Sequence, residues 1–385
     1  MKKLLIFLIL VFAFLAGGYF FISKKLGVNP RVAISLLNPP QTAPIKLGPQ
    51  GDKLPFPLTV KEGYHIGVFA NLEGSLPRVL AFDPGGTLLA SIPGRGRIIV
   101  LPDRDKNGIA DEVKTLLSGL NRPHGIAFFE DKIYVAETDK VVRYDYDQKN
   151  FLTGTREVLF SLPGGGRHFT RTIKVIDGKL YTSVGSSCDT CRENDEKLAA
   201  MLVSDIDGKN LRVYAKGLRN TVFFTEGPDG KIWGTDMGRD FLGDNLPPDD
   251  INIIEEGKNY GWPYCYGDKV RDLKFEGKEN LDYCSRTTPP IYAIPAHNAP
   301  LGLTFMGGSL LVSLHGSWNS SVPVGYKVVT LDVNGRKVMN MQDFVTGFIK
   351  GTEVKGRPVD LVIDGEGKLF ISDDKAGLVY VVTKI

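Results

Sequence analysis

Hydrophobic and polar positions follow one recurring pattern between residues 79 and 374. An apolar strand leads into a turn with glycine or an acidic residue, and a second strand ends in small or acidic residues. The six copies read VLAFDPGGTLLASIP from Val79, GIAFFEDKIYVAETD from Gly125, IKVIDGKLYTSVGS from Ile173, VFFTEGPDGKIWGTDMG from Val222, LGLTFMGGSLLVSLHGS from Leu301 and VDLVIDGEGKLFISDD from Val359. Such segments predict β-strands, and no long helical periodicity follows the N-terminal apolar run. The body of the chain should therefore be nearly all β.

The spacing of the copies indicates how these strands are arranged. Equivalent positions in the second strands are Leu89, Ile133, Leu180, Ile232, Leu310 and Leu369, which lie 44, 47, 52, 78 and 59 residues apart by subtraction. A repeat of about 40 to 50 residues with several strands per unit is typical of a β-propeller. Six copies predict an all-β, six-bladed β-propeller of four-stranded antiparallel blades. The longest gap holds an insertion, Asp240 to Arg286, and long loops on a rigid scaffold often carry binding.

The first 25 residues predict export from the cytoplasm. Two lysines precede an apolar run from Leu4 to Ile22, and two more lysines follow it. This is the charge pattern of an export signal, and about 19 residues are just enough to cross a bilayer. We expect an N-terminal apolar anchor helix that tethers a periplasmic or extracellular body to the membrane, with a cleaved signal peptide as the alternative. Residues 26–55, rich in proline, are expected as a linker, and residues 56–385 as the propeller.

The four cysteines also bear on whether the protein is exported. They stand at positions 188, 191, 265 and 284, and an even count in an exported protein favours disulfides. We expect the pairs 188–191 and 265–284. Free thiols or a single zinc site remain alternatives, although the second pair lacks the spacing of a zinc ribbon. Arg192, rather than a histidine, follows Cys191, which argues against covalent haem attachment.

Net charge and histidine content narrow the function classes. The formal charge of +3 is too small to indicate a nucleic-acid partner. The histidines are at positions 65, 124, 168, 297 and 315, so any histidine chemistry must use one of these five.

Residues just before each copy should gather at one mouth of the central channel, because every inner strand begins there. They include His124, His168, Arg219, Asn220, Pro300 and Arg357. Three glycines, 164–166, precede His168 and leave room for a ligand. A pocket at the mouth is therefore predicted. The alternatives are that His124 and His168 only pack against neighbours and that Arg219 is a surface ion-pair partner.

A separate motif predicts calcium. Asp103, Asp105, Asn107 and Asp111 match the pattern DxDxNGxxD, which places oxygen ligands at alternate positions with glycine at the sixth. Lys114 at the twelfth position excludes a complete EF-hand. The alternative is an acidic turn between strands.

Several segments together resemble the soluble quinoprotein glucose/sorbosone dehydrogenase family, and most closely its L-sorbosone-dehydrogenase-like branch. They are GGGRHFTRTI, GLRNTVFFTEGPDGKIWGTDMGRD, DDINIIEEGKNYGWPYCYGD, LHGSWNSSVPVGYKVV and GRPVDLVIDGEGKLFISDD, and the resemblance covers about residues 60–385. It implies a six-bladed propeller that holds pyrroloquinoline quinone (PQQ) on a calcium ion at the channel mouth. It also implies a histidine base that takes the proton of the sugar's anomeric hydroxyl while hydride moves to the quinone.

The resemblance also implies roles for single residues. His168 matches the base, Arg219 and Asn220 match the pair over the quinone oxygens, and the carbonyls of Gly238 and Arg239 match the calcium ligands. Arg357 matches the first of two arginines that hold PQQ carboxylates. The remaining cofactor-wall candidates are His124, His315, Trp318, Asn319 and Lys327.

Three positions depart from the family pattern. The second arginine falls on Val359, and a family lysine falls on His315, with Lys327 as a candidate substitute. The usual HxGGR is HFTRT here, with Arg171 shifted by one position. These departures bear on PQQ affinity and on the range of sugars.

The resulting hypothesis is an exported, PQQ- and calcium-dependent dehydrogenase of an aldose sugar or an aldehyde, with a quinone or cytochrome as the external electron acceptor. In such an enzyme the cofactor carries the redox chemistry and the protein orients it. One alternative is a lactonase-type propeller hydrolase, which holds its metal with Glu, Asp and Asn. The other is a binding propeller without a cofactor, which the departures at Val359 and His315 would favour.

Overall fold

The computed structural model describes residues 11, 14, 17–25, 27–39, 46–48, 54–275 and 282–385. Most of the expected anchor, Leu4 to Ile22, lies outside the described residues. Within the part that is described, no helix is both long enough and apolar enough to cross a membrane. The short π-helix η1 (Phe21–Lys25) begins at the end of the apolar run. The anchor helix therefore stays a prediction.

Each of the first three blades is a four-stranded antiparallel sheet whose strands follow chain order. The first blade has β3 (Leu80–Phe82), β4 (Leu88–Ile92), β5 (Arg97–Leu101) and β6 (Lys114–Leu117), the second has β7 (Ile126–Phe129), β8 (Lys132–Ala136), β9 (Lys140–Asp147) and β10 (Leu152–Ser161), and the third has β11 (Arg171–Ile176), β12 (Lys179–Val184), β13 (Ala200–Asp205) and β14 (Arg212–Lys216).

The other three blades complete the ring, and the last one joins the two ends of the described body. The fourth blade has β15 (Phe224–Glu226), β16 (Ile232–Asp236), β17 (Asp249–Ile254) and β20 (Tyr292–Ile294), the fifth has β21 (Pro300–Met306), β22 (Ser309–Leu314), β23 (Lys327–Asn334), β24 (Lys337–Thr346) and β1 (Thr59–Val60), and the sixth has β27 (Pro358–Ile363), β28 (Leu369–Asp373), β29 (Leu378–Lys384) and β2 (Tyr64–Asn71). Because β2 pairs with β29, an early strand closes the last blade.

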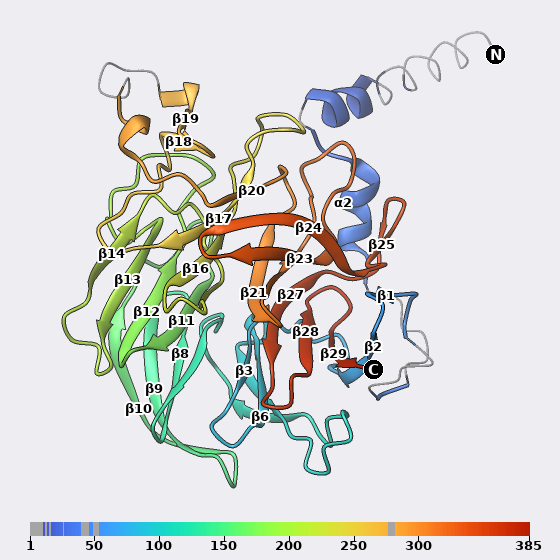
Figure 1. The fold of residues 1–385 in the computed structure, drawn as a ribbon, viewed down its shortest axis with the longest axis vertical. Helices are drawn as coiled ribbons and strands as arrows, with labels where there is room; N and C mark the ends of the chain where they lie inside the picture. The colour runs from blue at the N-terminus through green and yellow to red at the C-terminus, as the bar shows by residue number, and fades with distance from the viewer. Residues whose placement is uncertain are drawn as a thin grey trace.

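The predicted six-bladed propeller is confirmed, and the six sequence copies are the two inner strands of the six blades (Figure 1). The equivalent second-strand residues are all buried, from 0% exposure at Leu89 to 4% at Ile232. They belong to apolar clusters that join neighbouring blades. Burial between sheets explains why both faces of the inner strands are apolar, since each sheet packs on two neighbours.

The expected linker is not extended throughout. It contains helix α2 (Pro30–Leu37), whose N-cap Asn29 accepts hydrogen bonds from the backbone of Arg31 and Val32. Ser35 Oγ accepts the N–H of Val354 at 2.7 Å, and Lys375 Nζ donates to the carbonyl of Ser35 at 2.8 Å. The helix is therefore docked against the small hairpin of β25 (Ile349–Lys350) and β26 (Glu353–Val354) and against the sixth blade.

Both predicted disulfides are present, Cys188–Cys191 and Cys265–Cys284. The second lies in the insertion, which carries the hairpin of β18 (Cys265–Tyr266) and β19 (Val270–Arg271) and the short 3-10 helices η3 (Leu273–Phe275) and η5 (Cys284–Arg286). Another 3-10 helix, η2 (Pro93–Arg95), links β4 to β5. In Figure 1 β18 and β19 lie beyond the end of the sheet of the third blade. The insertion thus extends over one end of the propeller.

Candidate active site

In five of the six blades, the inner strand or the loop before it donates a backbone N–H to a side chain at the end of the second strand or just after it. In the first, third and sixth blades a serine on the second strand accepts the N–H of an inner-strand residue: Ser91 from Val79, Ser183 from Thr172 and Ser372 from Asp360. In the second, fourth and sixth blades an acidic residue at the end of the second strand or just after it, Glu137, Asp236 or Asp373, accepts an N–H of the loop before the inner strand. The small and acidic strand ends seen in the sequence therefore hold the channel-mouth loops in place.

His168 lies at this mouth, just before β11, and is only partly exposed. Its Nδ1 is 3.0 Å from the carbonyl of Ser186 and 2.9 Å from the Oγ of the same residue. Because a carbonyl can only accept, Nδ1 carries the proton and Nε2 keeps its lone pair. Burial and the positive charge of Arg219 lower the pKa of His168 to about 3, so the ring is neutral near pH 7.

Arg219 and Asn220 lie next to His168, in the loop before β15. Asp236, at the end of β16, accepts the N–H of Arg219 at 2.9 Å and that of Asn220 at 2.6 Å. Both side chains are buried, and Oδ1 of Asn220 has no hydrogen-bond partner among the described residues. Gly185 is in contact with both His168 and Asn220, since a Cβ built there would lie 2.7 Å from each. The structure therefore brings the predicted base and the predicted Arg–Asn pair together.

An acidic pair surrounds the Arg219 guanidinium. Asp189 Oδ1 accepts from NH2 at 2.7 Å, and Asp240 Oδ2 lies 3.9 Å from the same atom. Asp240 also binds Arg167 and accepts from Asn319 Nδ2 at 2.5 Å. Burial and the charge of Asp189 raise the pKa of Asp240 to about 6, against the opposing effect of the arginines. Asn319 is thus linked to the site through Asp240.

Gly238 and Arg239, the predicted calcium carbonyls, follow β16 on the far side of Arg219. The N–H of Gly238 donates to Asp249 Oδ1 at 2.8 Å, and a Cβ at position 238 would meet Pro247 and Pro248 at 2.7 Å. Arg239 pairs with Asp272 of the insertion at 2.8 Å. These contacts confine the backbone of residues 238–239 to one path.

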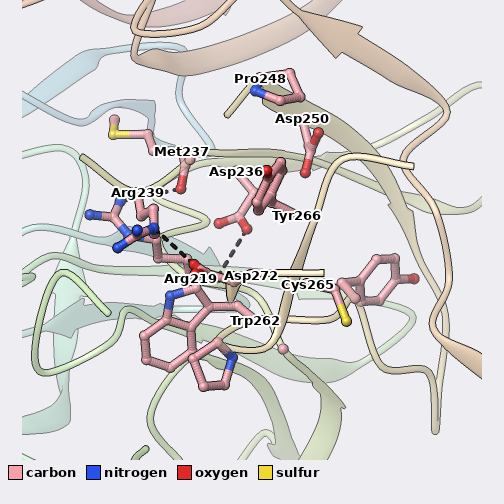
Figure 2. Close-up of a pocket in the computed structure, with 14 residues that line it drawn as sticks. Arg219, Asp236, Met237, Arg239, Pro248, Asp250, Trp262, Cys265, Tyr266 and Asp272 are labelled. Carbon is pink, nitrogen blue, oxygen red and sulfur yellow. Dashed lines mark hydrogen bonds and ion pairs between the residues drawn. The ribbon is translucent and has the colours of Figure 1, made fainter. Parts of the chain in front are cut away.

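A small pocket lies behind this segment, between the fourth blade and the insertion. Figure 2 shows Asp236, Asp250 and Asp272 around it, together with Trp262 and Tyr266. Its volume is about 20 Å³, which is room for about one water molecule. The pocket is therefore too small for a cofactor or a sugar, and the insertion here supports the site from behind.

Across the mouth, His315 and Arg357 form a second cluster. Arg357 donates from Nε to the carbonyl of His315 at 3.0 Å and from NH2 to that of Gly316 at 2.8 Å. His315 Nε2 is 2.8 Å from Asp374 Oδ1, and Arg78 NH1 donates to the other oxygen of Asp374 at 2.5 Å. Burial and Arg357 lower the pKa of His315 to about 4. The cluster thus brings two guanidinium groups, Arg78 and Arg357, to one side of the mouth.

His124, the rival candidate for the base, lies deeper in the channel. Its side chain is fully buried, with Nε2 3.4 Å from Arg78 Nε and Nδ1 3.1 Å from Thr172 Oγ1. Both ring nitrogens are therefore engaged by protein groups, which favours packing over a role as base, and a cofactor contact by His124 stays a prediction.

The other wall candidates lie at different distances from the site. Trp318 is 38% exposed, stacks edge-on against Phe241 with ring centroids 5.9 Å apart, and lies under the guanidinium of Arg167. Lys327 instead pairs with Asp343 at 2.6 Å on the outer strands of the fifth blade. Trp318 therefore belongs to the rim of the mouth, whereas Lys327 is directed to a surface ion pair.

A cavity of about 540 Å³ opens at the mouth beside the first and second blades. Its charged walls are Arg78, Arg95, Arg122 and Asp374, and Phe169 adjoins the proposed base. The guanidinium of Arg122 lies 3.4 Å from the centre of the Phe169 ring. Three arginines against one carboxylate make this cavity suited to an anionic ligand.

The predicted calcium loop lies at the opposite end of the propeller. It joins β5 to β6, and it borders the same groove as the β3–β4 turn. Asp103 accepts the N–H groups of Asn107 and Gly108, while Asp111 pairs with Arg104 at 3.1 Å. Among the described residues, Cys188, Cys191 and Glu193 bring three possible donor atoms together, but the two sulfurs are joined in a disulfide and are not thiolate ligands. Calcium binding at this loop stays a prediction.

Sequence reasoning missed Arg78, Ser186, Asp189, Asp240 and Asp374. A signal existed for Arg78, because it precedes the first inner strand as His168 precedes the third. Asp374 likewise ends a sequence copy. Asp189 and Asp240 lie in loops outside the repeat, so no pattern pointed to them.

A family model described as TrAA12-like matches residues 58–385. The chain is 31% identical to an uncharacterized protein of Borreliella burgdorferi, over 84% of this chain and 90% of that one. It is 25% identical to the pyrroloquinoline quinone-dependent pyranose dehydrogenase of Coprinopsis cinerea, over 86% of this chain but only 55% of the fungal one.

Solved structures share the fold. The holo form of the PQQ domain of the Coprinopsis cinerea pyranose dehydrogenase has a TM-score of 0.76 at 23% identity, covering 86% of this chain and 97% of that one. The calcium structure of a Trichoderma reesei enzyme of Carbohydrate-Active Enzymes Family AA12 has a TM-score of 0.78 at 20% identity, covering 89% and 100%.

Proposed function

The chain belongs to the TrAA12-like family, and from this premise we propose that it is a PQQ-dependent sugar dehydrogenase. The observation that carries the proposal is the meeting of a neutral histidine, His168, with Arg219 and Asn220 beside a cavity walled by three arginines. The resemblance of the fungal pyranose dehydrogenase supports it. Within this class, we propose an aldose or a sorbosone-like aldehyde as the substrate.

The side chains at the mouth fit an anionic quinone. PQQ carries carboxylates, and Arg78 and Arg357 would bind these from one side of the mouth. Three of the five N–H donors of Arg219 bond to Asp189 and Met237, which leaves two for a ligand. The unpaired Oδ1 of Asn220 is a further polar atom that needs a partner. We also propose that the carbonyls of Gly238 and Arg239 would hold the calcium ion that polarises the quinone.

Arg78 offers an answer to the departure at position 359. Val359 is fully buried in the apolar core, so it cannot act as the second arginine. Arg78 instead brings a second guanidinium to Asp374, close to Arg357. Two positively charged groups, Arg78 and Arg357, therefore remain at this side of the mouth although the second family arginine is replaced by Val359.

The chain's own residues would supply a general base and the groups that orient it and keep it neutral. PQQ, when bound, would supply the quinone that accepts hydride from the sugar. Nε2 of His168 would take the proton of the sugar hydroxyl, and Ser186 would hold the ring in the tautomer that keeps Nε2 unprotonated. Arg219 would offer its remaining N–H donors to developing negative charge. Its own charge also keeps His168 neutral.

The two rival functions have less support. A lactonase-type hydrolase would gather Glu, Asp and Asn ligands in the channel, but among the described residues the carboxylates at the mouth, Asp189, Asp240 and Asp374, are each paired with an arginine. A binding propeller without a cofactor was favoured by Val359 and His315. Arg78 and the Arg357 contacts weaken that argument. We further propose export, because the two disulfides are of the kind that persists outside the cytoplasm.

The proposal is tested by steady-state turnover of the protein loaded with PQQ and calcium, with a panel of aldoses and aldehydes and an artificial electron acceptor. Turnover should fall about 10² to 10⁴-fold in His168→Gln while PQQ still binds. His124→Ala should mainly lower thermal stability. If His124→Ala abolished turnover while His168→Gln retained it, the base would be wrongly assigned. If no substrate supported turnover, the dehydrogenase function would fall.

A further inference from the structure

Resting on this proposed function, we infer that Asp189 is a positioning residue, which the Cys188–Cys191 disulfide loop presents to Arg219 so that the guanidinium is fixed beside His168. Asp189 lies between the two cysteines and is outside the repeat. It would contact neither cofactor nor sugar, and its effect would pass through Arg219.

Asp189 holds the guanidinium from two atoms. Its backbone carbonyl accepts from Arg219 Nε at 2.8 Å, and its Oδ1 accepts from NH2 at 2.7 Å. The same Oδ1 also accepts the N–H of Asp240 at 2.9 Å. The Arg219 side chain is only 5% exposed and that of Asp189 only 19% exposed, so water competes little for these bonds. Two fixed acceptors on one residue define both the position and the plane of a guanidinium.

The loop itself is held at several points. The disulfide joins its two ends, Ser186 Oγ donates to the carbonyl of Cys188 at 2.7 Å, and Lys274 Nζ donates to that of Thr190 at 2.7 Å. Ser186 is also the residue that binds Nδ1 of His168. The proposed base and Arg219 are therefore positioned from the same short loop.

A competing carboxylate makes this positioning necessary. Asp240 Oδ2 lies 3.9 Å from Arg219 NH2 and already binds Arg167. Without the Asp189 carboxylate, NH2 of the guanidinium would lose its Oδ1 acceptor while Nε keeps the backbone carbonyl, and Asp240 would be the nearest negative charge. We expect Arg219 to turn toward Asp240 and to leave the orientation in which its remaining donors are available.

The experiment compares Asp189→Ala, Asp189→Asn and the double variant Cys188→Ser/Cys191→Ser in the full chain. Asp83→Ala is the matched control, because Asp83 is also buried and accepts from Tyr146 OH at 2.8 Å and Thr87 N at 2.8 Å, far from the mouth. Two readouts are used. The first is modification of Arg219 by phenylglyoxal in the protein without cofactor, mapped by mass spectrometry. The second is kcat and KM with saturating PQQ and calcium.

In the wild type, Arg219 should be protected, whereas Arg212, whose side chain is 54% exposed, should react. Asp189→Ala should raise the modification of Arg219 by about 10-fold. It should lower kcat about 10 to 100-fold with KM changed less than about threefold. The cysteine double variant should shift both readouts in the same direction. Asp189→Asn should keep most of the protection of Arg219 and most of kcat, because it has an oxygen at the Oδ1 position that Asp189→Ala lacks. Asp83→Ala should lower thermal stability and leave both readouts unchanged.

The outcomes separate this inference from the proposed function. If the wild type turns over but Asp189→Ala keeps Arg219 protected and kcat within about twofold, the positioning role is wrong and the function stands. If the wild type shows no turnover, the proposed function falls, and the modification readout still decides whether Asp189 fixes Arg219. If Asp189→Ala does not fold, Asp189→Asn and the cysteine double variant decide. An Asp189→Asn variant as impaired as Asp189→Ala would overturn the inference in favour of a purely electrostatic role.

Discussion

Gly185→Ala should impair the site without unfolding the protein. Gly185 follows β12 and is buried between His168 and Asn220. A Cβ added there would lie 2.7 Å from the Cβ of His168 and 2.7 Å from Oδ1 of Asn220. Ordinary contact begins at 3.4 Å, so one or both side chains must move by about 0.7 Å. The backbone at this glycine needs no left-handed conformation, so the effect is purely steric.

The size of the effect follows from that displacement. A misplacement of 1 Å at a reacting group costs about 10²-fold in rate, so about 0.7 Å should lower kcat/KM about 10 to 100-fold. Local overpacking typically costs about 1–3 kcal/mol, which is less than the usual stability of a folded domain. The variant should therefore stay folded and lose activity.

The assay is kcat/KM of the PQQ-loaded protein together with a thermal unfolding curve. Gly365→Ala is the control, because Gly365 lies in the β27–β28 turn and an added Cβ would meet nothing within 4 Å. That control should match the wild type in both measurements. If Gly185→Ala folded and kept wild-type kcat/KM, the positions of His168 and Asn220 would not matter for turnover, and the assignment of the site would be refuted.

Three further predictions concern protonation, charge and calcium. The folded pKa of His168 is lowered to about 3, below the ordinary value of about 6.5, so its ring should not titrate between about pH 8 and pH 5 in an NMR experiment. For the same reason this histidine stabilises the fold above pH 6.5 and loses that contribution as pH falls toward 3. A titration midpoint of His168 near pH 6.5 would contradict a buried ring beside the positive charge of Arg219. Arg78→Ala should weaken PQQ binding about 10 to 100-fold in a fluorescence titration, because it removes a charged donor beside Asp374, and unchanged affinity would exclude it from the site. Calcium should raise the melting temperature of the wild type more than that of Asp105→Ala, which keeps the separate site proposed at Gly238 and Arg239; equal responses would show that the loop is only a turn.

Much of the fold could be predicted because the repeat and the blade are the same unit. The six copies mark the inner strands, and their buried leucines and isoleucines occupy equivalent places in the six sheets. The closing strand β2 could not be predicted, because it pairs with β29 across almost the whole chain and resembles no copy. Helix α2 was also missed, since it has only eight residues, of which the first is a proline, and is stabilised by contacts with Val354 and Lys375.

The candidate site could be predicted only for residues that directly precede the inner strands of the repeat. His168, Arg219 and Arg357 precede inner strands, and the structure places all three at the mouth. His124 occupies the same sequence position but lies below the mouth, because Arg78 covers it. Sequence position cannot distinguish a side chain that lines the mouth from one that fills the channel beneath it. Lys327 was predicted at the site because it is near His315 in the sequence, whereas in the structure it lies on β23 and pairs with Asp343.

The most direct test of the central claim is the absorption spectrum of bound PQQ. Purified protein without cofactor would be titrated with PQQ in the presence of calcium, freed of excess cofactor, and then mixed with an aldose in the absence of any electron acceptor. The account predicts a bound quinone spectrum that converts to the reduced form on adding sugar, and a conversion at least about 10²-fold slower in His168→Gln, with PQQ still bound. Failure of the wild type to retain PQQ, or retention without reduction by any sugar or aldehyde, would contradict it.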